Sequence, residues 1–445
     1  MPHDRPSAPA APAPGAPTGA SAAGSPGGAP GASAAGSPGP SSAGARGVSA
    51  AGAPGASAPG SPGGRDVVGV GMVGYAFMGR AHSQAWRTVD HFFDLPVRPR
   101  MAAICGRDAS KVEAAAARLG WTAWETDWKR LIARDDVDLV DVCTPGSSHA
   151  EISIAALEAG KHVLCEKPLA NSVAEARAMA DAAATAAARG VRAMVGFNFR
   201  RVPAVALARQ LIADGRLGTI RHVRGAYLAS PLVDPSFPLL WRLRAEEAGS
   251  GALGDLGAHA VDLAQYLVGD RIAGVSALTE TFVSRRPLPD GGGTGEVTVD
   301  DAALFIARFA GGPLGAFEAT RFASGHKEGL RVEVNGDLGS VVWELDHLND
   351  LQFYDGTAER GLRGFRRIRA TEREHPYAGA WWPDGHVIGY EHTFSNEVAD
   401  LLGDVAAGRD PVPSFADGLA VQEVLDAVLR SAEGGSAWTP VGGTR

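Results

Sequence analysis

The feature that most constrains the fold is a regular alternation of short apolar runs with helical segments, which begins at Asp66. The apolar runs have the length and composition of buried strands: Val67–Val73, Arg100–Cys105, Asp138–Cys143, His162–Cys165 and Val191–Phe197. The segments between them are rich in Ala, and two carry a Ser-x-x-Glu capping box, at Ser110 and at Ser172. Strands that alternate with helices of this length form a parallel sheet with helices on both faces. We therefore expect a Rossmann-type, doubly wound α/β domain that binds ligands beyond the carboxyl ends of its strands.

The pattern changes after Phe197. Strand-like runs separated by turn sequences such as GGP, NGD and YDG now dominate, at Ile272–Val283, Val299–Phe309, Leu314–Phe322, Leu330–Asn335 and Ser340–Leu345. Helical patterns accompany them, at Val205–Asp214, Asp255–Leu267, Glu391–Ala407 and Phe415–Ala432. Short strands linked by tight turns indicate an antiparallel sheet. We predict a Rossmann-type domain over residues 65–197 and an α+β domain with a mostly antiparallel sheet over residues 198–445.

Residues 1–64 differ in composition from the rest of the chain. Ala, Pro, Gly and Ser dominate, and the segment ASAAGSPG occurs twice, starting at Ala20 and at Ala32. Such a segment buries too little apolar area to offset the entropy lost on folding, so we expect a disordered tail without a role in the chemistry. It also lacks the basic start and the apolar core of a secretory signal peptide.

The net charge and the cysteines restrict the partners of the chain. A net charge of −8 disfavours binding to nucleic acid and to anionic membrane surfaces, which requires clustered Lys and Arg. No apolar run reaches the ~18 residues of a transmembrane helix. The three cysteines, Cys105, Cys143 and Cys165, each end an apolar run, as expected for buried thiols in a reducing cytoplasm. No CxxC or HExxH motif is present, so we expect no bound metal.

A dinucleotide-binding turn is predicted where the first strand ends. The letters GxGxxG occur in Gly69–Gly74, but that segment lies inside the apolar run. The variant GxAxxG starts at the end of the strand, and these residues would hold the dinucleotide: Gly74, Ala76, Phe77, Met78 and Gly79. The first Gly makes the tight turn, the Ala lets the backbone approach a pyrophosphate, and the last Gly permits close packing of a helix from about Gly79. The alternative is a Gly-rich turn that binds no nucleotide.

The residues after the second strand select between NAD and NADP. An Asp or Glu there accepts hydrogen bonds from the ribose of NAD, whereas an Arg pairs with the 2′-phosphate of NADP. This strand ends in the sequence Cys105-Gly106-Arg107-Asp108. Arg107 comes before any carboxylate, which slightly favours NADP, although Asp108 would still reach the ribose. The alternative for Arg107 is a solvated loop residue.

Two groups of polar residues are candidates for the chemistry. Lys167, within Glu166-Lys167-Pro168, follows a strand at the ligand-binding end of the sheet. Asp255 and His259 are one helical turn apart and would share a helix face with Asp262. A His with a carboxylate one turn away is oriented as a proton-transfer group near neutral pH. The structural alternatives are an exposed lysine at a strand end and an N-cap aspartate bonded to a histidine.

Five segments resemble successive motifs of the glucose–fructose oxidoreductase/inositol dehydrogenase/rhizopine-catabolism (Gfo/Idh/MocA) family: VGYAFMGRAH, CTPGSSHAE, GKHVLCEKPLA, GFNFRR and GDLGAHAVDL. The resemblance extends from about Asp66 to the C-terminus. It implies that Lys167 assists proton transfer and contacts the cofactor, and that His259, beside Asp255, is the general acid/base. It also implies a substrate-side role for Asn198. The residues that would line the cofactor cleft are Thr144, Pro145, His149 and Glu166.

The resemblance implies an NAD(P)-dependent oxidoreductase that moves a hydride between the nicotinamide and a secondary hydroxyl of a sugar or polyol. His259 would take the hydroxyl proton, Lys167 would stabilise the oxyanion, and Asp255 would hold the imidazole in the right tautomer. Two other functions stay open at this point: glycoside hydrolysis through transient oxidation, and dinucleotide sensing without turnover.

Residues late in the chain are candidates for the sugar-binding wall, because sugar rings stack on flat apolar surfaces. These candidates are Trp382 and His386, with Trp381 and Tyr390 close by in the sequence. Ordinary packing in the loop before Glu391 is the alternative. The family resemblance and the edge strands of the second domain also predict a homo-oligomer, a dimer or tetramer formed through its sheet.

Overall fold

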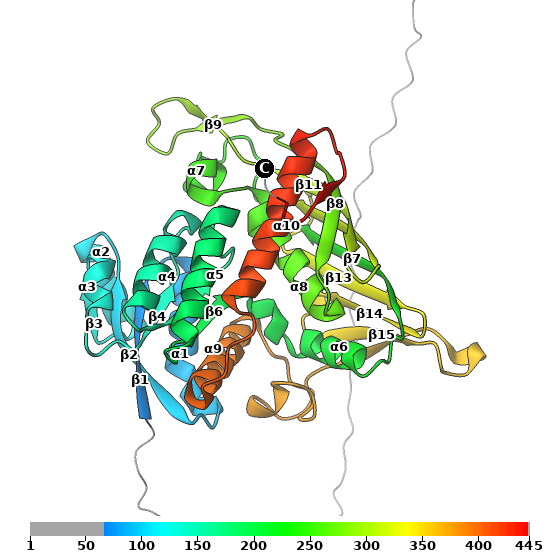
Figure 1. The fold of residues 1–445 in the computed structure, drawn as a ribbon, viewed down its shortest axis with the longest axis horizontal. Coiled ribbons are helices and arrows are strands. Elements are labelled where there is room, and N and C mark those ends of the chain that lie inside the picture. Colours follow the sequence, from blue (N-terminus) through cyan, green and yellow to red (C-terminus); the bar gives the residue numbers. More distant parts are fainter. Residues whose placement is uncertain (1–65, 444–445) are drawn as a thin grey trace, which may run out of the picture. The chain divides into compact units, whose positions relative to one another are not determined.

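The computed structural model describes residues 66–443, so the predicted tail lies outside the described residues. Its first part is a six-stranded parallel sheet of order β3-β2-β1-β4-β5-β6 (Figure 1). The strands are β1 (Asp66–Val73), β2 (Val97–Cys105), β3 (Ala123–Glu125), β4 (Leu139–Val142), β5 (His162–Glu166) and β6 (Ala193–Gly196). The strand order changes direction between β1 and β4, which is the switch point of a doubly wound sheet. The Rossmann-type prediction is therefore confirmed.

Helices cover both faces of this sheet. One face packs against α1 (Phe77–Phe92), α2 (Ala109–Leu119) and a helix from the end of the chain, α9 (Tyr390–Ala407). The other face packs against α3 (Trp128–Ile132), α4 (His149–Glu158) and α5 (Val173–Ala187). Glycine in β1 permits the close approach of α3, because a Cβ on Gly71 would lie 2.7 Å from the side chain of Leu131. The boundary between the two domains at residue 197 stays a prediction.

The helix caps agree with the sequence at one helix and differ at another. Ser172 caps α5 as predicted, since its Oγ accepts a hydrogen bond from the backbone N–H of Glu175 at 3.2 Å. The capping box predicted at Ser110 is wrong. The N-cap of α2 is Asp108, whose Oδ1 accepts from the backbone N–H of Lys111 at 3.1 Å. The carboxylate begins the helix before the serine because it satisfies the same free N–H groups more strongly.

The second sheet has the order β16-β15-β14-β13-β7-β12-β11-β8-β17, and β9 and β10 form a separate hairpin. The strands are β7 (Ile220–Leu228), β8 (Ile272–Glu280), β9 (Arg285–Pro287), β10 (Thr294–Glu296), β11 (Ala302–Phe309), β12 (Leu314–Thr320), β13 (Gly329–Gly336), β14 (Gly339–Glu344), β15 (Asp350–Asp355), β16 (Phe365–Arg369) and β17 (Thr439–Pro440). In the described part of the chain, only β7 and β12 of this sheet pair in parallel. The prediction of a mostly antiparallel sheet is confirmed.

Helices on one face of the second sheet connect it to the first. They are α6 (Pro203–Ala213), a π-helical turn (Leu253–Gly257) that leads into α8 (Ala258–Val268), and α10 (Phe415–Glu433). The short helix α7 (Ala245–Ala248) packs against the loop after β4. Helix α8 packs on β7 and β13, and α10 contacts both β8 and α5. Figure 1 shows α10 between these two elements. One apolar core is therefore shared by both sheets. Between residues 66 and 443, no helix has the length and apolarity needed to span a membrane.

Candidate active site

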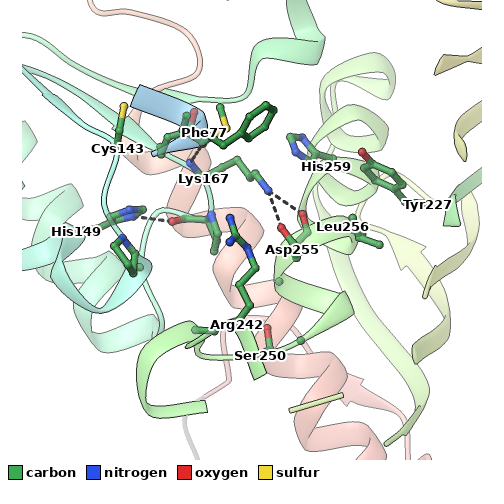
Figure 2. A pocket seen from close by; sticks show the side chains of 18 of the residues that line it. Phe77, Cys143, His149, Lys167, Tyr227, Arg242, Ser250, Asp255, Leu256 and His259 are labelled. Carbon is green, nitrogen blue, oxygen red and sulfur yellow. Dashed lines mark hydrogen bonds and ion pairs between the residues drawn. The ribbon is translucent and has the colours of Figure 1, made fainter. Parts of the chain in front are cut away.

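A cavity of about 670 Å³ lies at the carboxyl ends of β1, β4, β5 and β6, where a doubly wound sheet is expected to bind its ligand (Figure 2). The loops that leave these strands form one wall, and the second domain contributes the rest. The predicted site residues that line it are Ala76, Phe77, Met78, Thr144, Pro145, His149, Glu166, Lys167, Asn198, Asp255 and His259. Residues predicted from distant motifs thus meet in one cavity.

The turn after β1 requires glycine at two positions. Gly74 has a φ of +107°, and a Cβ there would lie 2.6 Å from the carbonyl oxygen of Cys143. A Cβ on Gly79 would lie 2.2 Å from the carbonyl oxygen of Gly74, so glycine lets α1 pack closely on the turn. The earlier glycines of the competing GxGxxG motif, Gly69 and Gly71, lie inside β1. The structure therefore favours the GxAxxG motif as the binding turn.

The N-terminus of α1 is open to an anion. The helix begins at Phe77, before the predicted start near Gly79. Its N-cap residue, Ala76, makes no side-chain capping bond, and its first turn holds no acidic residue. Free N–H groups and the helix dipole favour a negatively charged group at such an end. Because Ala76, Phe77 and Met78 line the cavity, this turn fits the pyrophosphate of a dinucleotide.

The end of β2 offers a cation and no free carboxylate. Besides capping α2, Asp108 forms an ion pair with Lys111, whose Nζ lies 3.1 Å from its Oδ2. The backbone hydrogen bond from Lys111, assisted by the Ser110 hydroxyl, lowers the pKa of Asp108 to about 2. Arg107 is exposed, forms no hydrogen bond or ion pair with any residue of the described chain, and lies outside the cavity lining. Its guanidinium is thus available to a ligand group beyond β2.

His149 connects the loops that follow β4 and β5. Its ring nitrogens lie 2.8 Å from the carbonyl oxygen of Thr144 and 3.0 Å from that of Pro168. Burial lowers the pKa of His149 below its ordinary value, so the ring is neutral and one nitrogen donates at a time. The imidazole therefore fixes the spacing of two loops of the cavity wall.

Lys167 reaches from the loop after β5 to the second domain (Figure 2). Its Nζ donates to the backbone carbonyl of Asp255 at 2.8 Å and lies 3.4 Å from the Oδ1 of the same residue. Burial by itself would raise the pKa of Asp255, but the positive charges of Lys167, Arg321 and Arg242 outweigh burial and lower it. The result is an ion pair across the cavity between the two domains.

His259 is buried at the start of α8, with 7% of its surface exposed. Aromatic rings surround it, with ring centroids at 4.8 Å for Phe199, 6.0 Å for Tyr227 and 6.1 Å for Phe197. No residue among those described donates to or accepts from its ring nitrogens. Burial, followed by the charge of Lys167, lowers the pKa of His259 well below its ordinary value. The imidazole is therefore neutral and keeps a nitrogen lone pair for a ligand in the cavity.

The structure corrects the predicted role of Asp255. We expected its carboxylate to orient the imidazole of His259, but it contacts Lys167 and forms no hydrogen bond with the ring. The π-helical turn interrupts the regular helix between the two residues, and such turns are frequent at functional sites. Asp262, expected on the same face, is buried instead against Arg200, whose Nε donates to its Oδ2 at 2.9 Å.

Glu166 is held by a buried network that sequence analysis missed. Its Oε1 lies 2.8 Å from the Nε2 of His82, and its Oε2 accepts from the backbone N–H of Lys167 at 3.1 Å. The other ring nitrogen of His82 lies 3.0 Å from Asp141, which also accepts from the indole of Trp86 at 2.7 Å. Burial alone would lower the pKa of His82, but Asp141 raises it well above its ordinary value. The carboxylate within the apolar run of β4 was the available signal, because a buried charge needs a partner.

The structure does not bring Trp382 or His386 to the cavity. Trp382 packs against Phe92, with ring centroids 5.4 Å apart. His386 is exposed, and its Nδ1 lies 2.8 Å from the carbonyl oxygen of Pro383. Trp382 thus follows the packing alternative, although 43% of its surface stays exposed, and His386 is a surface residue. Tyr390, from the same segment, does line the cavity.

Asn198 lines the cavity and donates from Nδ2 to the hydroxyl of Thr393 at 2.8 Å. Several second-domain residues that sequence analysis did not single out join it there: Tyr227, Trp241, Arg242, Arg321 and Glu328. They come from a strand, a 3-10 helix and loops that share no motif. Only the folded chain identifies them as neighbours.

Two family models match the chain. The model described as "Oxidoreductase family, NAD-binding Rossmann fold" matches residues 68–197. The model described as "GFO/IDH/MocA C-terminal domain" matches residues 205–342. Together they cover most of the chain that the structure describes.

Characterised relatives extend over most of the chain. The chain is 41% identical over 377 residues to levoglucosan dehydrogenase of Pseudarthrobacter phenanthrenivorans, an alignment that covers 82% of this chain and 95% of the relative. It is 27% identical over 364 residues to inositol 2-dehydrogenase of Rhizobium meliloti, covering 81% and 96%.

Solved structures share the fold. An oxidoreductase domain protein from Kribbella flavida is 60% identical, with a TM-score of 0.83 over 85% of this chain and 100% of that chain. A levoglucosan dehydrogenase in complex with NADH and levoglucosan is 40% identical, with a TM-score of 0.81 over 84% and 99%.

Proposed function

The chain belongs to the Gfo/Idh/MocA family of oxidoreductases, and from this premise we propose that it is an NAD(P)-dependent dehydrogenase acting on a secondary hydroxyl of a cyclic sugar or polyol. One observation carries the proposal: Lys167 and His259, from different domains, line the same cavity. They provide a cation and a neutral imidazole, the two groups that oxidation of an alcohol requires at its oxygen. The named activities of the levoglucosan and inositol dehydrogenases support this substrate class.

The protein residues handle the proton and the charge. His259 accepts the proton of the substrate hydroxyl through its free ring nitrogen. Lys167 stabilises the negative charge that develops on that oxygen. Asp255 positions Lys167 through its backbone carbonyl and its carboxylate, a role that replaces the predicted orientation of the imidazole. A bound nicotinamide would accept the hydride from the carbinol carbon.

The dinucleotide would lie along the first domain. The turn from Gly74 to Gly79 and the N-terminus of α1 would bind the pyrophosphate. The loops after β4 and β5 would face the nicotinamide half, through Thr144, Pro145, His149 and Glu166. We propose that NADP is accepted at least as well as NAD, because Arg107 is unpaired and Asp108 is occupied by capping α2.

The exposed face of the second sheet supports a homo-oligomer. Leu278, Leu304, Ile306 and Leu314 are each more than 40% exposed and lie on neighbouring strands of that face. An apolar patch on a sheet face is typical of an interface. We propose a dimer or tetramer formed through this sheet. The free, buried Cys105, Cys143 and Cys165 favour a reducing compartment, the cytoplasm.

The test is formation of reduced nicotinamide with a panel of sugars and polyols, run with NAD and with NADP. We expect absorbance of the reduced cofactor to rise in proportion to the product. Product without accumulation of the reduced cofactor would contradict the proposal and indicate hydrolysis through transient oxidation. Cofactor binding without any product from the whole panel would indicate a sensor.

A further inference from the structure

Three carboxylates line the cavity, and one of them has no cationic partner. Asp255 is paired with Lys167, and Glu166 is bound to His82. Glu328 forms no ion pair with any residue of the described chain. Its neighbour is a phenol, because the hydroxyl of Tyr227 donates to its Oε2 at 2.9 Å.

The contact with Tyr227 fixes the direction of this carboxylate. Tyr227 lies on β7, and Glu328 directly precedes β13, the strand that pairs with β7. The loop is also tied down by Ser230, whose hydroxyl donates to the carbonyl of His326 at 2.7 Å. Burial, together with the charge of Glu328, raises the pKa of Tyr227 above its ordinary range, so the phenol keeps its proton and remains a donor. The Oε1 of Glu328 is left without a hydrogen-bond donor among the described residues.

This carboxylate lies close to the proposed site of proton transfer. The ring of Tyr227 is 6.0 Å from that of His259, and both rings border the cavity beside Lys167 (Figure 2). A substrate whose reacting hydroxyl contacts His259 would extend its other ring substituents along this wall. The exposed carboxylate of Glu328, with one oxygen that no described residue bonds, lies on this wall and can accept hydrogen bonds from them.

We propose that Glu328, oriented by Tyr227, accepts hydrogen bonds from non-reacting hydroxyls of the substrate and thereby selects an uncharged polyhydroxy ring. The proposal rests on the proposed function and specifies its substrate class. The carboxylate is exposed to solvent in the free protein, so a bound ring would displace its water, and a ligand without the matching donor would then leave the charge unpaired. An anionic sugar whose carboxylate faces Glu328 would be repelled by the same charge.

Binding and turnover are measured separately. Isothermal titration of the NADH-loaded protein uses levoglucosan, myo-inositol, D-glucuronate and D-glucosamine as probes. For the uncharged probes that bind to wild type, we expect Glu328→Gln to weaken binding about ten-fold or more, the range for hydrogen bonds to charged groups. Tyr227→Phe keeps the ring and removes the hydroxyl that orients the carboxylate, so we expect a smaller loss. Lys327→Gln changes the charge of the adjacent exposed residue, which does not line the cavity, and should bind like wild type.

Each result decides the assignment. The assignment of Glu328 is overturned if Glu328→Gln binds every probe like wild type. It is also overturned if no uncharged probe binds to wild type, or if wild type binds D-glucuronate or D-glucosamine more tightly than the uncharged probes. In steady-state kinetics, Glu328→Gln should raise KM more than it lowers kcat. Failure of the proposed function would look different: wild type would bind an uncharged probe and yet form no reduced or oxidised cofactor with any sugar. Selective loss of binding in Glu328→Gln would still be seen in that case.

Discussion

The side-chain nitrogen of Lys167 lies 2.8 Å from the backbone carbonyl oxygen of Asp255, a residue 88 positions later in the chain. The hydrogen bond holds a cation of the first domain against the π-helical turn of the second. The same cation lowers the pKa of His259, next to burial, which is the larger cause. One contact between the domains therefore sets the position of the lysine, whose charge adds to the effect of burial on the pKa of the imidazole.

This coupling predicts how activity depends on pH. Neutral His259 is the base, so kcat/KM for oxidation should fall as the pH falls. The apparent pKa of this fall should lie below 6.5, the ordinary value for histidine. Lys167→Met removes a positive neighbour, which should move this acidic limb to higher pH as well as slow the reaction. The measurement is kcat/KM from about pH 5 to about pH 9. Lys129→Met, on the exposed face of α3, is the control. An acidic limb that stays in place in Lys167→Met would show that the two groups are not coupled.

The same shift affects stability. The unfolded chain takes up a proton at His259 below pH 6.5 while the native chain does not, so the free energy of unfolding falls as the pH falls through this range. His259→Ala should reduce this part of the acid sensitivity in urea denaturation.

The glycine turn predicts a selective loss of cofactor binding. In Gly74→Ala the alanine would have to adopt a positive φ, and its Cβ would clash with the carbonyl oxygen of Cys143. Gly120→Ala is the matched control, because Gly120 also has a positive φ, +85°, but nothing lies within 4 Å of its Cβ. Both variants should lose about 1–2 kcal/mol of stability from the backbone conformation. Gly74→Ala should in addition weaken NADH binding in a fluorescence titration. Equal NADH affinity in the two variants would remove the turn from the binding site.

The end of β2 predicts cofactor choice. Arg107→Ala should weaken NADP binding and leave NAD binding nearly unchanged, because Arg107 has no partner within the described chain. Arg118→Ala serves as the control, because it removes an exposed positive charge from the last turn of α2, the helix that follows Arg107. Titrations with both cofactors decide the matter. Equal weakening of the two would mean that Arg107 does not contact the 2′-phosphate.

The sheet face predicts the oligomeric state. Ile306 is 59% exposed on β11 and belongs to the same patch as Leu278, Leu304 and Leu314. Ile306→Glu should shift sedimentation velocity profiles toward the monomer at micromolar concentration, because a charge would be buried in the interface. Val387→Glu, which changes an exposed apolar residue outside this sheet, should not. A wild type that sediments as a monomer would contradict the predicted assembly.

Much of the fold could be predicted, because strands buried on both faces appear as apolar runs and helices as the segments between them. The short elements β3 and α3 were missed, since a strand of three residues carries no periodic signal. The π-helical turn was missed as well, because the pattern around Asp255 fits a regular helix equally well. In the presence of that turn, the carboxylate contacts Lys167 and the predicted contact with His259 does not form.

The candidate site could be predicted where its residues belong to motifs. Gly74, Lys167 and His259 all fall at strand ends or in a helix with a recognisable pattern. Glu328 and Tyr227 do not, because their neighbourhood depends on the pairing of β7 with β13. Trp382 shows the opposite error, since an aromatic residue suggests a sugar wall from sequence but packs against Phe92 in the fold.

The most direct test of the account is the single-turnover rate of Lys167→Met, His259→Ala and the double variant, each with a parallel NAD(P) titration. General acid–base groups contribute about 10²–10⁴-fold in rate, so each single variant should lose roughly that factor while cofactor affinity changes only modestly. The double variant should be scarcely slower than either single one, because the two groups act on the same hydroxyl. Asp255→Asn, which keeps the backbone carbonyl and loses the charge beside Lys167, should fall between wild type and Lys167→Met. Near-normal turnover by His259→Ala with the true substrate would contradict the assignment of the base.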